Sequence, residues 1–65
     1  MKLNAIRLET FLAERGMTKA ALANRSEISR QSLSTIIRRG TCEPRTLGKL
    51  AKALNVPVEE LLEAV

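Results

Sequence analysis

The stretch from Ser29 to Arg38, SRQSLSTIIR, holds the side chains of this sequence that are best suited to recognise another molecule. As a helix it would turn Leu33, Ile36 and Ile37 toward a core, because residues three and four apart share one side. Its other side carries no acid and presents side chains that can hydrogen-bond to base edges in a DNA major groove, which an α-helix fits. We therefore predict a recognition helix, the alternative being an ordinary solvated face. The predicted base contacts are Arg30, Gln31, Ser34 and Thr35.

A second group of polar and basic residues around that stretch could hold phosphate. Arg38, Arg39 and Arg45 cluster near Pro44, a residue suited to begin a helix, and a helix N-terminus attracts phosphate. The alternative for this group is scattered surface charge. The predicted phosphate contacts are Lys19, Ser32, Arg38, Arg39, Thr41 and Arg45.

Charge is distributed unevenly along the 65 residues, which carry a formal net charge of +4 at pH 7. Between Arg15 and Lys52 there are nine basic residues and two acidic ones, whereas the two flanks together are acidic. A basic middle segment between acidic ends indicates one surface suited to a polyanion such as double-stranded DNA. Within this segment we interpret Arg15 and Arg25 as ordinary surface charges.

Several classes of protein are excluded by the residue types. With no His and a single Cys, Cys42, we expect no internal disulfide, no metal site and no hydrolytic Ser-His or Cys-His pair. Glu59 and Glu60 could be considered a catalytic carboxylate pair. They fall, however, in an expected first helical turn, where the helix dipole favours acids, and we therefore interpret them as structural. We expect no enzyme activity and no cofactor. Cys42 is interpreted as a loop residue, with a redox contact or a phosphate neighbour as alternatives.

No apolar run approaches the roughly 20 residues needed to cross a membrane, and the N-terminus lacks the pattern of a secretion signal. We therefore expect a soluble cytoplasmic protein with no membrane partner. Residues 1–65 would form one small domain, since a chain of this size buries only about 60% of its unfolded surface.

Apolar spacing predicts five helical segments and no strand, because only one residue is aromatic and β-branched alternation is missing. The expected segments span residues 3 or 4 to 15, 18 to 26, 29 to 39, 44 to 54 and 58 to 65. Thr18 and Ser29 would cap the second and third segments at their N-termini. Gly16, Gly40 and Asn55 would end the first, third and fourth in the left-handed conformation.

Two segments, TKAALANRSEISRQSLSTII and GKLAKALNVPVEELLE, carry a resemblance that covers Leu8 to Glu63. They resemble the helix-turn-helix and the fourth and fifth helices of Xre-type, phage-repressor-like (Cro/repressor) regulators. The resemblance implies an all-α, compact, five-helix lambda-repressor-like domain, usually dimeric, with its third helix in the major groove. The positions that match the family's spacing are Leu22, Ala23, Ile28, Ser29, Leu33 and Ile36.

Some positions depart from that family's pattern. Glu27 stands where Gly is usual, so the turn either adopts φ > 0 at a Glu or takes another form. Gly40 lies one residue late, which implies a longer recognition helix, and Lys19 replaces a Gln that often contacts phosphate. Leu12 and Ile37 stand where members commonly carry an Arg and a Glu. We expect these two residues to touch in the core, in place of an ion pair.

From these observations we expect a small sequence-specific transcriptional regulator, acting as a repressor and as a homodimer at least on DNA. One alternative is an antitoxin or mobile-element regulator that also binds a partner protein. Another is a helix-turn-helix interaction module that does not bind DNA, although apolar or acidic residues would then be expected on the outer face of the Ser29 helix, which shows neither. The residues predicted for a dimer contact, with burial in the core as the alternative, are Leu61, Leu62 and Val65.

Overall fold

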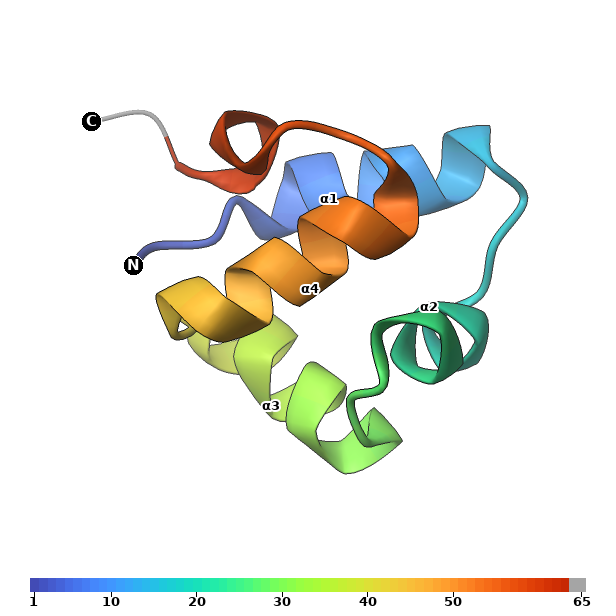
Figure 1. The fold of residues 1–65 in the computed structure, drawn as a ribbon, viewed down its shortest axis with the longest axis horizontal. Coiled ribbons are helices and arrows are strands. Elements are labelled where there is room, and N and C mark those ends of the chain that lie inside the picture. The colour runs from blue at the N-terminus through green and yellow to red at the C-terminus, as the bar shows by residue number, and fades with distance from the viewer. Residues whose placement is uncertain (64–65) are drawn as a thin grey trace.

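A computed structural model describes residues 1–63, which form four α-helices and one 3-10 helix (Figure 1). The elements are α1 (Ala5–Glu14), α2 (Lys19–Ser26), α3 (Arg30–Arg39), α4 (Pro44–Leu54) and the 3-10 helix η1 (Val58–Leu61). The described residues contain no strand, so the all-helical prediction is confirmed.

The fifth segment corrects the expectation of a helix running to the C-terminus. After Val58–Leu61 the chain becomes extended at Leu62, which forms an isolated bridge with Leu3. The Asn4 N–H donates to the Leu61 carbonyl at 2.8 Å, and the Glu63 N–H donates to the Lys2 carbonyl at 3.1 Å. The backbone groups here pair with the N-terminal segment, and this pairing ends the helix after four residues.

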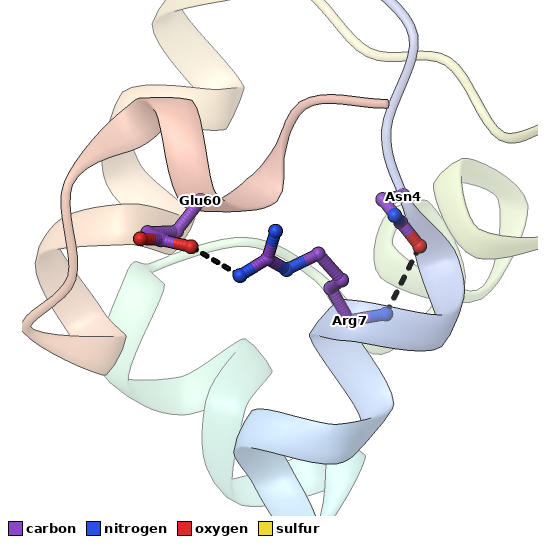
Figure 2. Close-up of polar contacts among 3 residues, drawn as sticks. All are labelled: Asn4, Arg7 and Glu60. Carbon is purple, nitrogen blue, oxygen red and sulfur yellow. Dashed lines mark hydrogen bonds and ion pairs between the residues drawn. The ribbon is translucent and has the colours of Figure 1, made fainter. Parts of the chain in front are cut away.

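Helix ends follow the residue types that the sequence places there. The Thr18 hydroxyl accepts from the Ala21 N–H at 3.1 Å, which caps α2 as predicted. In α1 the cap is Asn4, whose side-chain oxygen accepts from the Arg7 N–H at 3.1 Å (Figure 2). Pro44 begins α4, and Asn55 ends it with φ at 59°, as expected. These caps set the lengths of the helices and so the places where the chain turns.

Leucine dominates the core, which lies between the helices. α2 packs against both α3 and α4, and η1 packs against α1 and α4. The extended N-terminal segment adds Leu3 to this core, and its N–H donates to the Gly40 carbonyl at 2.9 Å, just after α3. The largest side chains that are at most 2% exposed are all leucines: Leu3, Leu8, Leu22, Leu33, Leu47, Leu50, Leu54 and Leu61.

An ion pair connects α1 with η1 near the C-terminal end of the described chain. The Arg7 guanidinium contacts the Glu60 carboxylate, both side chains being about half exposed (Figure 2). Within residues 1–63, no helix has the length and apolar character of a membrane-spanning segment.

Candidate nucleic-acid interface

The turn between α2 and α3 is built around Glu27, which adopts the left-handed conformation with φ 59° and ψ 34°. Of the two options that the sequence left open, the chain therefore takes φ > 0 at a non-glycine residue, which is energetically unfavourable. The Ile28 N–H closes the turn by donating to the Ala23 carbonyl at 3.0 Å. Ala23 is buried here, so its small side chain allows α2 and α3 to cross closely.

At the start of α3, Ser29 acts as the N-cap that the sequence predicts. Its hydroxyl accepts from the Ser32 N–H at 3.0 Å, which satisfies one of the free N–H groups of the first turn. The Ser29 hydroxyl also donates to the Ser32 hydroxyl at 2.8 Å. Ser32 is exposed, and its hydroxyl already accepts a hydrogen bond from Ser29 within the cap.

One side of α3 is held by the core and the other is open to solvent. Leu33 is buried and 1% exposed, while Ile36 and Ile37 are half-buried against the same core. We call these three residues the inner face. The outer face consists of the predicted base contacts, Arg30, Gln31, Ser34 and Thr35.

Most of the outer face is free to contact a ligand. Arg30, Gln31 and Ser34 are exposed, and Thr35 is half-buried. The Thr35 hydroxyl donates to the Gln31 carbonyl at 3.0 Å, so its hydrogen is occupied while its oxygen can still accept. The structure thus brings all four predicted base contacts onto one short helical surface.

Two hollows of opposite charge flank the outer face. On the α2 side, a hollow of about 470 Å³ is lined by Lys19 and Arg30 among others. On the side of the α3–α4 loop, a hollow of about 650 Å³ is lined by Glu27 and Glu43. Gln31 lines both hollows, so α3 lies between a basic flank and an acidic flank.

This acidic flank was missed by the sequence reasoning, although the two acids of the basic segment were a signal for it. Glu27 and Glu43 are far apart in sequence, and only the packing of the α3–α4 loop beside α3 puts them on one hollow. Carboxylates at this place oppose a nearby phosphate, because like charges repel, and they lie beside two proposed phosphate sites, Ser32 in the same hollow and the N-terminus of α4 that Glu43 precedes.

Lys19, a predicted phosphate contact, has a partner within the protein. Its ammonium nitrogen lies 3.0 Å from a carboxylate oxygen of Glu9 on α1, and both side chains are about half exposed. An exposed ion pair of this kind contributes little to stability, so the ammonium remains able to exchange partners.

The last turn of α3, the loop after it and the first turn of α4 present the remaining predicted phosphate contacts. Gly40 ends α3 with φ at 72°, and all four of these contacts are exposed: Arg38, Arg39, Thr41 and Arg45. Glu43 is the N-cap of α4 but makes no side-chain cap hydrogen bond. The first N–H groups of α4 are therefore not taken by a capping side chain.

Arg15, interpreted from sequence as a surface charge, has a structural role. Its Nε donates to the Leu54 carbonyl at 3.0 Å, and its guanidinium lies 5.1 Å from the centre of the Phe11 ring. The bond to Leu54 connects the end of α1 to the end of α4, which no local pattern indicates, whereas the contact with Phe11 lies within the α1 region. Cys42 is half-buried in the loop after α3, and this burial raises the pKa of its thiol.

The predicted dimer contacts lie in different environments. Leu61 is fully buried in its own chain, as in the alternative of core burial that the sequence left open, because η1 directs it into the core. Leu62 is half-buried beside Leu3 and keeps part of its surface. Val65 lies outside the described residues.

Comparison with known proteins places the chain in a family. Residues 7–65 match the model of the Cro/C1-type HTH DNA-binding domain. The match covers most of the chain, and this protein belongs to the Cro/C1-type helix-turn-helix DNA-binding family. Membership supports double-stranded DNA binding and transcription regulation. No match was found among curated proteins or among solved structures.

Proposed function

We propose that this protein is a sequence-specific repressor that binds double-stranded DNA by placing the outer face of α3 in the major groove. The observation that carries the proposal is that outer face, which is exposed and free of acid on a helix anchored by Leu33. Arg can bond guanine bidentately and Gln can do so with adenine, so Arg30 and Gln31 would read bases from the first turn of α3. Ser34 and Thr35 would extend this reading along the helix.

Phosphate contacts on both sides of α3 would hold the helix in register. Lys19 would exchange Glu9 for a phosphate at the basic flank, and Ser32 would contact the backbone from the α3 cap. Beyond α3, the uncapped N-terminus of α4 and the surrounding basic side chains would hold a second phosphate region. The contacts there are Arg38, Arg39, Thr41 and Arg45.

The protein would act in the cytoplasm, without a cofactor or enzyme activity, and would bind as a homodimer at least on DNA. Leu62 and Val65 are the proposed dimer contacts. A two-fold dimer of this class spaces its half-sites by about one helical turn, roughly 34 Å. Footprints without dyad symmetry would instead indicate monomeric or head-to-tail binding.

Titration of labelled duplex DNA at several salt concentrations tests the proposal. About four to six phosphate contacts per monomer should give a slope of log affinity against log salt of roughly −4 to −5. An operator selected from random duplexes should bind more tightly than unselected DNA. A slope near zero, or no enrichment over random sequence, would contradict sequence-specific DNA binding.

A second candidate function is a regulator, such as an antitoxin or mobile-element regulator, that also binds a partner protein. A cationic surface on α2 and α4 that includes none of the proposed DNA contacts favours it. A protein-interaction module without DNA binding is disfavoured by the acid-free outer face of α3.

A further inference from the structure

The packing of α2 against α4 assembles a cationic surface apart from the proposed DNA contacts. Arg25 in the last turn of α2 lies across the helix seam from Lys49 and Lys52 on α4. The three side chains line a hollow of about 560 Å³, which we call the α2–α4 basic hollow. Its one acidic lining residue is Glu27, so cations outnumber carboxylates three to one.

Among residues 1–63, no ion pair neutralises these three cations. The ion pairs within residues 1–63 join Arg7 to Glu60 and Lys19 to Glu9. Arg25 and Lys52 each lie in the last turn of a helix, where a cation interacts favourably with the helix dipole. The helix dipole therefore accounts for the positions of Arg25 and Lys52. It does not account for the position of Lys49, or for the presence of all three cations at one hollow.

The two lysines of this hollow lie away from the proposed DNA contacts, although its Glu27 also lines the acidic flank of α3. α4 begins beside the end of α3, and its other end lies away from α3 (Figure 1). At the rise of an α-helix, Lys49 and Lys52 lie about 7 Å and about 12 Å along the axis from Pro44. None of the proposed base or phosphate contacts lines the hollow. A ligand here would therefore not need to leave when DNA binds.

The spacing of the cations favours an acidic helix as the ligand. Lys49 and Lys52 are three residues apart, so they share one side of α4 at a separation of about 5–6 Å. Carboxylates three or four residues apart on a partner helix have a matching separation, while Arg25 offers a bidentate partner from the opposite wall. We propose that the α2–α4 basic hollow docks an acidic helical segment of another protein, simultaneously with DNA.

Fluorescence anisotropy with a defined probe tests the proposal. The probe is a capped, alanine-rich helical peptide with glutamates three and four residues apart along one face, and its control carries glutamine at those positions. The glutamate peptide should bind the wild-type protein with and without saturating duplex DNA, and the glutamine peptide should not. Lys49→Gln combined with Lys52→Gln should weaken peptide binding by about three- to tenfold, as expected for two surface ion pairs. DNA affinity should change by less than about twofold.

A matched variant that removes the same charge elsewhere provides the control. Arg38→Gln combined with Arg39→Gln should weaken DNA binding and leave peptide binding unchanged. Arg25→Gln offers an independent test of the opposite wall should the lysine variant lose its helical circular dichroism signal.

Three results would overturn the proposal: displacement of the peptide by duplex DNA, absence of peptide binding, or equal peptide affinity for wild-type and hollow variants. A loss of concentration-dependent self-association in the lysine variant, without any peptide binding, would instead assign the hollow to contacts between copies of the chain. Peptide binding that persists in a protein found not to bind DNA would contradict the proposed function but not peptide docking itself. It would, however, overturn simultaneous binding.

Discussion

The two faces of α3 have different roles. Residues that stabilise the fold and residues proposed to recognise DNA are interleaved along the ten residues of this helix. On the inner face, Leu33 is fully buried and Ile36 and Ile37 pack against the core. On the outer face, Arg30 and Gln31 are exposed and are not needed to fill the core. Because apolar burial dominates folding energy and exposed polar residues contribute little to it, stability and recognition should respond separately to mutation.

The largest expected effect concerns the inner face and its surroundings. Leu12 is buried in the core and Ile37 packs against that core, as expected from sequence for a pair of apolar residues that replaces an ion pair. Leu12→Arg should destabilise the protein by about 3–5 kcal/mol, because it buries a charge without a partner, and Ile37→Glu should cost less, because Ile37 is only half-buried. Urea unfolding followed by circular dichroism measures the loss.

The double variant with both charges should recover much of that stability if the two side chains are in contact. Wild-type base preference should be retained wherever the variant is folded, since the outer face is untouched. Additive losses in the double-mutant cycle would show that Leu12 and Ile37 are not neighbours.

A smaller effect, confined to DNA binding, is expected on the outer face. Arg30→Ala should cost about 1–3 kcal/mol on a selected operator and little on random DNA, because it removes a base contact. Preference at one or two base positions should flatten. Competition binding with operator and random duplexes measures both values, while the free energy of unfolding should change by less than about 0.5 kcal/mol.

Arg45→Ala is the matched control for phosphate contact. It should weaken binding to both duplexes equally and reduce the salt slope by about one unit. Equal losses on operator and random DNA for Arg30→Ala as well would mean that α3 does not read bases.

The smallest effect is expected at the turn that connects the two helices. Glu27→Gly should stabilise the protein by about 0.5–1 kcal/mol, since relief of the left-handed conformation exceeds the added freedom of the unfolded chain. For a domain of this size that gain raises the Tm by several degrees.

Asn55→Gly is a suitable comparison because Asn55 has the same φ of 59° but tolerates it better than Glu. Its gain should be smaller. A lower Tm for Glu27→Gly would show that the Glu27 side chain stabilises the turn.

The helices and their ends were predictable because their determinants are local. Hydroxyl caps at Thr18 and Ser29 and left-handed residues at Gly16 and Gly40 act within a turn of their own position. Leucines spaced three and four apart define a buried stripe on each helix whatever its partner is. In α3 the apolar stripe also defines the opposite side of the helix as its outer face, so the candidate base contacts could be selected from sequence.

Only tertiary structure decided the features that join distant segments. Pairing of Leu62 with Leu3 ended the last helix early, and Arg15 gained its role from the Leu54 carbonyl. Glu27 adopts the left-handed conformation at the turn between α2 and α3, against its local preference. The charged flanks of α3 and the α2–α4 basic hollow also depend on tertiary structure. Helix packing brings together side chains from separate elements, and the local sequence around one of them does not predict the others.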